Sequence, residues 1–167
     1  MDVRITICMG GMERMRKKCK RKVWATNINP VAHAIAGAAV SDKQALDKLR
    51  LCELSAIDAL TKGMGTTEDW RWCCDFLNIG ETMGKSGIGP EILPHCKEAQ
   101  EALLEAAERY QKTGKMGLSG QGIRAIKEVW EFHDVQRTSV ARSEYEKMIR
   151  KTANYIKSHG KDVVEIV

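Results

Sequence analysis

The feature that most constrains the fold is the spacing of apolar residues from about residue 42 onward. Leu46, Leu49, Cys52, Ala56 and Leu60 recur at steps of three and four, which places them on one face of an α-helix. No stretch of four or more residues alternates convincingly between apolar and polar side chains, as a half-buried β-strand would. The pattern therefore predicts an all-α fold.

Start signals divide this pattern into about six helices. They are N-cap residues, capping boxes and prolines suited to a first helical turn. The predicted starts are Asn29-Pro30, the capping box Ser41–Gln44, Thr66, Pro90 or Pro94, the end of the glycine-rich segment Gly114–Gly122, and a second capping box Ser143–Glu146. The first helix would run from Val31 to about Ala39. The chain has 167 residues, the length of one domain, so we expect a compact bundle or an orthogonal array.

Charge divides the chain into a basic N-terminal segment and a near-neutral remainder. Residues 1–22 hold eight Lys or Arg and two acidic residues, whereas residues 23–167 hold nineteen basic and twenty acidic residues. A block of like charge repels itself and buries little apolar surface. We therefore expect a disordered tail at 1–22, a helical domain at 23–160 and a C-terminal tail at 161–167. Met15 is an alternative start of the protein.

The basic tail is the strongest functional signal. Seven of the last nine residues of this tail, residues 14–22, are basic: Arg14, Arg16, Lys17, Lys18, Lys20, Arg21 and Lys22. Such a cluster neutralises phosphates and releases counterions, which gives salt-sensitive and sequence-independent binding to nucleic acid. The tail has no interleaved aromatic or apolar anchors for a membrane surface.

A second accumulation of basic residues lies near the C-terminus. It comprises Arg137, Arg142, Lys147, Arg150, Lys151, Lys157 and Lys161. At helical spacing, Lys147, Arg150, Lys151 and Lys157 can share the outer face of the last helix, and we predict Arg150 and Lys151 as additional phosphate contacts. The alternative is an ordinary solvated helix face.

Residues that could carry catalysis do not form a recognisable set. His133-Asp134 follows Trp130 on the predicted apolar face of the fifth helix, so we expect His133 to be satisfied in the core. Gly84-Lys85-Ser86 fails the phosphate-loop pattern, because Gly80 is one residue too close and the preceding segment is helical. We expect a protein that is not an enzyme and uses no cofactor.

The cysteines and the N-terminus indicate a cytoplasmic protein. None of the six cysteines forms a C-x-x-C pair, so we expect reduced thiols, mostly in the core, and no structural zinc. Met1–Met9 lacks the regions of a signal peptide. No run approaches the ~18 apolar residues of a membrane span.

Two features allow two interpretations each. Trp70 belongs to a predicted core stripe with Cys73 and Leu77, but Trp72 lies about 200° away around the same helix. Either that helix is buried on both sides or Trp72 is an exposed anchor for a protein partner. The segment Gly114–Gly122 is either a long interhelical loop or a backbone cradle for an anion.

Several short motifs carry a resemblance to a known group of proteins. They are the basic run Arg16–Lys22 followed by Asn29-Pro30, then Thr67–Trp70, Asn78–Glu81, Ala99–Leu103, Arg109-Tyr110, Thr113–Lys115 and His133–Gln136. From about Met15 to its end, the chain resembles small helical proteins of unknown activity carried by phages and prophages of Gram-negative bacteria. Some of these are labelled transcription regulators, but no helix-turn-helix with a clear recognition helix is visible here. The resemblance implies origin and fold.

The leading hypothesis is a phage or prophage accessory regulator that binds nucleic acid or a nucleoprotein complex through its basic tail. It would act in the host cell cytoplasm. The alternative is a protein-binding inhibitor of host machinery, such as an anti-CRISPR or other anti-defence protein or an RNA polymerase modulator, acting through Trp72 and the small-residue helix Val31–Ala39. A virion or assembly component is a third possibility.

Overall fold

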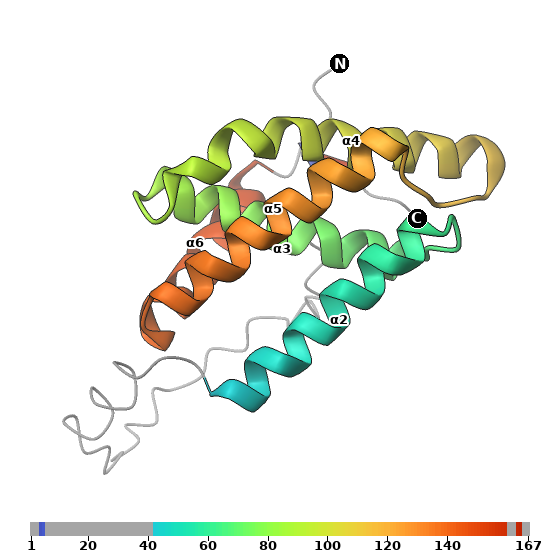
Figure 1. The fold of residues 1–167 in the computed structure, drawn as a ribbon. Coiled ribbons are helices and arrows are strands. Elements are labelled where there is room, and N and C mark those ends of the chain that lie inside the picture. Colours follow the sequence, from blue (N-terminus) through green and yellow to red (C-terminus); the bar gives the residue numbers. More distant parts are fainter. Residues whose placement is uncertain (1–3, 6–41, 160–162, 165–167) are drawn as a thin grey trace, which may run out of the picture.

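The structure is a computed structural model that describes residues 4–5, 42–159 and 163–164. Its helices, shown in Figure 1, are α2 (Lys43–Thr61), α3 (Thr67–Lys85), the short 3-10 helix η1 (Pro90–Ile92), α4 (Leu93–Thr113), α5 (Gly120–Ser139) and α6 (Arg142–Ser158). The prediction of an all-α domain is confirmed. The described part holds five α-helices rather than six, and the helix predicted at Val31–Ala39 lies outside it.

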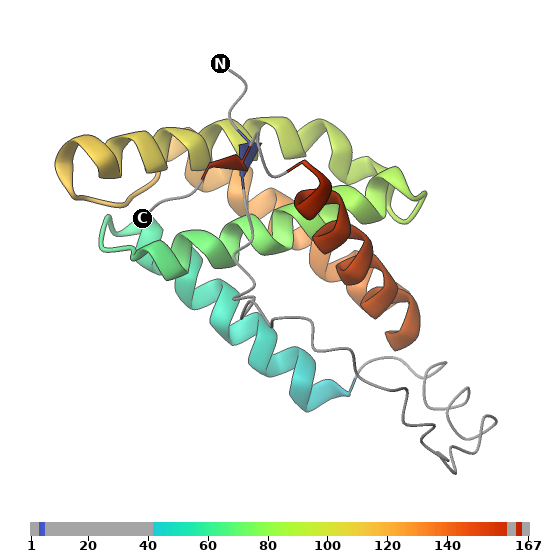
Figure 2. The same ribbon diagram turned by 180° about the vertical axis from the view of Figure 1, so that it is seen from behind.

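A two-residue pairing accompanies the helices. β1 (Arg4–Ile5) and β2 (Val163–Val164) pair in parallel, with Arg4 opposite Val163. Figure 2 shows the pair from behind, in blue and dark red. Both strands fall in segments that the sequence predicts to be tails, so the structure brings parts of the two tails together.

Helix α3 is the centre of the arrangement. It contacts α2, α4, α5 and α6, and α5 and α6 lie on opposite sides of it (Figures 1 and 2). A central helix needs apolar residues on several faces. Accordingly, Trp70, Cys73 and Leu77 of the predicted stripe are buried together with Cys74 on the same face, and Phe76 is buried beyond the edge of that face.

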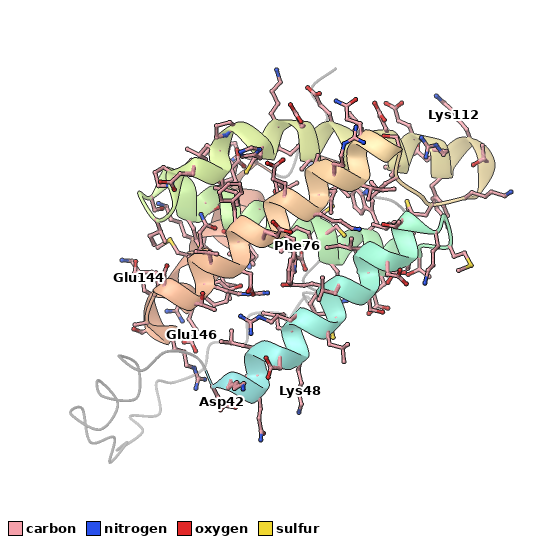
Figure 3. The ribbon with its side chains drawn as sticks, in the orientation of Figure 1. Asp42, Lys48, Phe76, Lys112, Glu144 and Glu146 are labelled. Carbon is pink, nitrogen blue, oxygen red and sulfur yellow. The ribbon has the colours of Figure 1, made fainter. Side chains whose placement is uncertain are left out.

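Buried side chains and exposed charges separate clearly across the helices. Phe76 points into the interior, while Lys48 and Lys112 project outward (Figure 3). The indole Nε1–H of Trp70 donates a hydrogen bond to the Leu103 carbonyl at 2.9 Å, which satisfies the one polar group of a buried tryptophan. This bond ties α3 to α4 inside the core.

Among the described residues, the predicted cap of α3 forms as expected. Thr66 caps this helix and exchanges hydrogen bonds with Asp69 in a complete capping box, which confirms that start. At the start of α2 the N-cap residue is Asp42, and its side chain makes no capping hydrogen bond. Ser41, the first residue of the box predicted there, lies outside the described residues.

The second predicted box, Ser143–Glu146, is wrong. Helix α6 begins at Arg142 with Ala141 as its N-cap, so Ser143 already lies within the first turn. The backbone N–H groups of Glu144 and Tyr145 both donate to the Ala141 carbonyl. This start has no side-chain cap, because alanine has no acceptor to offer.

The glycine-rich segment between α4 and α5 is short and closely packed. Gly114, at φ +69°, ends α4. A Cβ atom on Gly117 would lie 2.9 Å from the Cα of Gly63, and one on Gly122 would lie 2.8 Å from the Cβ of Ala102. Glycine is therefore required where backbones approach one another. The sequence correctly predicts the connection, but not its contact with the α2–α3 turn.

Candidate functional site

Two groups of charged side chains are candidates for function. The first joins α2 to α5 and is here called the ion cluster; it consists of Arg50, Glu53, Asp134 and Arg137. The second is the α6 basic face, which consists of Lys147, Arg150, Lys151 and Lys157. The ion cluster is largely enclosed and the basic face is exposed, so the two can do different chemistry.

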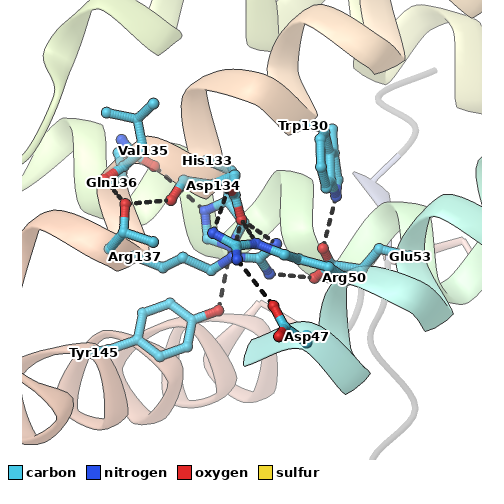
Figure 4. Close-up of polar contacts among 11 residues, drawn as sticks. Asp47, Arg50, Glu53, Trp130, His133, Asp134, Val135, Gln136, Arg137 and Tyr145 are labelled. Carbon is cyan, nitrogen blue, oxygen red and sulfur yellow. Dashed lines mark hydrogen bonds and ion pairs between the residues drawn. The ribbon is translucent and has the colours of Figure 1, made fainter. Parts of the chain in front are cut away.

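The centre of the ion cluster is a fully buried pair (Figure 4). Arg137 Nη1 donates to Glu53 Oε1 at 2.8 Å, and the side chains are 0% and 3% exposed. The other carboxylate oxygen of Glu53 accepts the indole N–H of Trp130 at 2.7 Å. Arg137 also lies over the Trp130 ring, 6.0 Å from its centroid. Both charges of this buried pair are thus matched by a partner, as burial requires.

Asp134 connects this pair to a second arginine. Arg50 donates from Nε and Nη2 to the two oxygens of Asp134 at 2.8 and 2.9 Å, which is the bidentate geometry that favours arginine. Arg137 Nε donates to the same carboxylate at 2.8 Å. Burial alone would raise the pKa of Asp134, but the hydrogen bonds and charges of the two arginines outweigh it and lower that pKa. Asp134 is therefore ionised at neutral pH.

Two sequence predictions are corrected by this cluster. Arg137 was assigned to the C-terminal basic accumulation, yet it is 1% exposed and its charge is neutralised within the protein. Cys52 was placed in the α2 core stripe, yet it is exposed, and the adjacent Glu53 is buried instead. From the sequence alone, a glutamate at this position is expected to be exposed to solvent. Its partner in the buried ion pair is 84 residues away along the chain, so no local pattern reveals the pair.

His133 forms a neutral hydrogen-bonded group beside the cluster. Its Nδ1 is 3.4 Å from Gln136 Oε1 and its Nε2 is 3.2 Å from the Tyr145 hydroxyl. The Gln136 amide nitrogen donates to the carbonyls of Ile88 and Gly89 at 2.7 and 3.1 Å. Its oxygen is therefore the acceptor, which assigns the proton to His133 Nδ1 and makes Tyr145 the donor to Nε2.

This arrangement holds His133 uncharged. Burial, aided by the charge of Arg137, lowers the pKa of His133 to about 3. Burial likewise raises the pKa of the Tyr145 hydroxyl to about 12. The prediction that His133 is satisfied in the core is confirmed. Neither group changes its protonation near neutral pH. Together with Gln136, they link α5, α6 and the turn before η1 through hydrogen bonds.

The buried cysteines have little nucleophilic character. Cys73, Cys74 and Cys96 are buried and free, whereas Cys52 is exposed. Burial raises the pKa of Cys73 well above its ordinary value and that of Cys96 to about 12, and a thiol is a weak nucleophile compared with its thiolate. Among the described residues, no three His, Cys, Asp or Glu side chains are placed to hold a metal ion.

Asp75 is a further acid on α3 and is half-buried. Its Oδ1 atom has no hydrogen-bond partner. Burial raises the pKa of Asp75 to about 7, although the charge of Arg71 acts in the opposite direction. The carboxyl group therefore keeps its proton to a higher pH than an exposed aspartate does, and it opposes His133 in the dependence of stability on pH.

The α6 basic face has a simple geometry. Tyr145, Met148 and Thr152 are buried on one side of α6, and Lys147, Arg150, Lys151 and Lys157 are exposed on the other. Lys147 lies 3.4 Å from Glu144 across the surface, and Lys151 Nζ donates to Ser86 Oγ at 2.8 Å. The four cationic groups are thus available to an anion in solvent.

The remaining predicted contact residues fall in two categories. The phosphate contacts predicted in the tail lie outside the described residues: Arg14, Arg16, Lys17, Lys18, Lys20, Arg21 and Lys22. Trp72 is partly buried and packs against the main core cluster. This fits the interpretation that α3 is buried on several sides, and a role for Trp72 in binding a partner stays a prediction.

The segment Gly114–Gly122 uses several of its backbone donors internally. The N–H of Leu118 donates to the Leu60 carbonyl at 3.1 Å, and that of Gly122 donates to Ser119 Oγ at 3.1 Å. Ser119 is the N-cap residue of α5. An anion cradle needs free and convergent N–H groups, so these bonds favour the packing role.

Comparisons with known proteins supply no relative for this chain. No family model, no curated protein and no solved structure matches it. None of the described helices has the length and apolar character required to cross a bilayer.

Proposed function

We propose that this protein is a non-enzymatic phage or prophage accessory regulator that binds nucleic acid or a nucleoprotein complex. The observation that carries the proposal is the pairing of a basic N-terminal segment with an exposed basic helix. Seven of residues 14–22 are Lys or Arg, and α6 exposes four more on one face. The origin and the regulatory role rest on the resemblance of the sequence to phage-borne helical proteins.

Helix α6 differs in charge from the other described α-helices. It holds five basic and two acidic side chains, a net charge of +3. Helices α2 and α5 are each neutral, α4 is −1 and α3 is −2. Positive charge in the described domain is therefore concentrated on α6, which supports contact between this helix and a polyanion.

The spacing of the cations on α6 suits a phosphate backbone. Lys147 and Lys157 are ten residues apart, which corresponds to roughly 15 Å along a helix axis. Arg150 and Lys151 lie between them. The nearby surface pairs, Arg142–Glu146 at 2.9 Å and Lys147–Glu144 at 3.4 Å, are exposed and contribute little. Replacing such a pair with a phosphate contact costs correspondingly little.

An electrophoretic shift assay over a salt series tests the proposal. The full chain is compared with a chain lacking residues 1–22 and with an Arg150→Ala/Lys151→Ala variant. We expect binding at low salt that weakens steeply as salt rises, with a slope close to −0.9 per phosphate neutralised on duplex DNA. Both variants should bind more weakly with a shallower slope.

A matched control removes the same charge elsewhere. Lys97 and Lys112 on α4 are 83% and 76% exposed, so Lys97→Ala/Lys112→Ala changes net charge equally without touching α6. This control should bind almost as the wild type does. Absence of binding at low salt, or equal losses in the control and the α6 variant, contradicts the proposal. A nuclease-resistant, stoichiometric protein partner recovered from host lysate would favour an inhibitor of host machinery instead.

A further inference from the structure

Helix α6 also presents an aromatic side chain to solvent. Tyr155 is 57% exposed, and it is the one exposed large aromatic among the described residues; the other exposed large hydrophobic side chains there are aliphatic or methionine. The ring of His159 stacks on it, with centroids 4.2 Å apart and an interplanar angle of 25°. The two rings stack face to face at the C-terminal end of α6 and are here called the aromatic pair.

Hydrogen bonds hold the His159 end of the aromatic pair. The Tyr155 carbonyl accepts the Ser158 hydroxyl at 2.8 Å and the His159 backbone N–H at 3.2 Å. His159 Nδ1 lies 2.9 Å from this carbonyl oxygen and 2.9 Å from Ser158 Oγ. These contacts restrain the His159 ring, and the Tyr155 ring is held by its stacking on His159, so binding to the pair loses less side-chain freedom than binding to a lone exposed ring.

The aromatic pair adjoins the α6 basic face. Lys151 precedes Tyr155 by four residues, which makes them neighbours on a helix surface, with Cβ atoms about 5–6 Å apart. Its Nζ is oriented by Ser86 Oγ. Lys157 follows Tyr155 by two residues and Arg150 precedes it by five, so these two cations lie on other sides of the helix. Lys151 is therefore the cation beside the rings, within reach of the phosphate that flanks a bound base.

We infer that α6 binds single-stranded nucleic acid, with an unpaired base stacked on the aromatic pair of Tyr155 and His159 and with Lys151 on a flanking phosphate. The inference rests on the proposed function and specifies its ligand. Aromatic platforms combined with a basic track are how proteins hold single strands without reading sequence. A duplex hides the faces of its bases within the stack, so it can use only the cations.

Fluorescence anisotropy with labelled oligonucleotides tests this inference. The probes are a mixed-sequence single strand of DNA, the same sequence as RNA, and the matching DNA duplex. The variants are Tyr155→Ala, which removes the ring, and Tyr155→Phe, which keeps it. The Tyr155 side chain is exposed and its hydroxyl makes no hydrogen bond within the described part of the chain, so both variants should retain the wild-type melting temperature.

We expect the wild type to bind the single strands more tightly than the duplex. Tyr155→Ala should weaken single-strand binding about 5- to 100-fold, the range for one stacked base, while Tyr155→Phe and duplex binding stay close to wild type. Equal affinity of Tyr155→Ala and wild type for single strands overturns the inference. If the Arg150→Ala/Lys151→Ala variant still loses binding in that case, the proposed function stands without stacking. If the wild type binds no probe at low salt, both fall.

Discussion

Arg137 and Arg150 lie thirteen residues apart and carry the same charge, yet they belong to different parts of the molecule. Arg137 is 1% exposed and bonded to two carboxylates, whereas Arg150 is exposed on α6. The first arginine is part of the fold and the second is available to a ligand. Net charge therefore describes binding capacity only after the buried, neutralised charges have been subtracted.

The energetic difference between the two arginines follows from solvent. A buried ion pair offsets the loss of hydration only while both partners are present, so removal of one partner leaves an uncompensated charge. An exposed cation keeps most of its hydration, and its pairing contributes about 0–1 kcal/mol. Three predictions test this contrast, in decreasing order of expected effect.

The largest effect is expected from Arg137→Met. The substitution removes the partner of Glu53 and should lower the free energy of unfolding by about 3–5 kcal/mol, measured by denaturant titration. The double variant Glu53→Met/Arg137→Met removes both charges and should recover most of the loss. If the single variant is as stable as the wild type, the ion cluster does not hold α2 against α5.

Opposed slopes of stability against pH are expected from His133 and Asp75. The pKa of His133 falls from 6.5 to about 3 on folding, so its contribution decreases as pH falls from about 6.5 toward 3. The pKa of Asp75 rises from 3.8 to about 7 on folding, so its contribution decreases as pH rises from about 4 to 7. In the wild type the two slopes largely cancel between pH 4 and 6.5.

Single substitutions should expose these slopes. His133→Gln should give a protein whose stability increases as pH is lowered through this range, and Asp75→Asn one whose stability decreases. Each slope has an upper limit of about 1.4 kcal/mol per pH unit, with a smaller value for the partly exposed Asp75. Denaturant titrations at pH 4.5, 5.5 and 6.5 provide the measurement. Parallel curves for the two variants would contradict the assigned environments.

The smallest effect on stability is expected from Arg150→Ala. The side chain is exposed and makes no hydrogen bond or ion pair within the described residues, so unfolding should change by no more than about 0.5 kcal/mol. The same variant should lose affinity for nucleic acid in the salt-series assay. A loss of stability comparable to that of Arg137→Met would show that the two arginines contribute equally to the stability of the fold.

The helices themselves could be predicted because their signals are local. The residues that make up each signal are close together in the sequence. The Thr66 capping box lies within one helical turn, the periodic apolar residues lie within a few turns, and the corresponding helices form. Trp70 and Leu77 lie on the buried stripe as expected. The cap predicted at Ser143 is wrong, because α6 begins two residues earlier than that cap requires, with Ala141 as the N-cap.

The ion cluster could not be predicted, because its information is distributed over distant residues. Glu53 and Arg137 are 84 residues apart. Within its own helix, each looks like an ordinary charged residue on a solvent-exposed face. Only the packing of α2 against α5 makes them partners. By contrast, the exposure of Lys147 and Lys157 follows from helical periodicity alone, and the structure agrees with it.

The close approach of Gly117 to Gly63 has a consequence for engineering the chain. Connections between helices usually tolerate inserted residues, but here two connections touch backbone to backbone, and Gly65 N–H bonds to the Met116 carbonyl at 3.2 Å. An epitope tag or a circular permutation at this end would separate α2 from α5. The α3–η1 turn is no better placed, because the carbonyls of Ile88 and Gly89 accept hydrogen bonds from Gln136 and a Cβ on Gly89 would lie 2.8 Å from the Gln136 side chain.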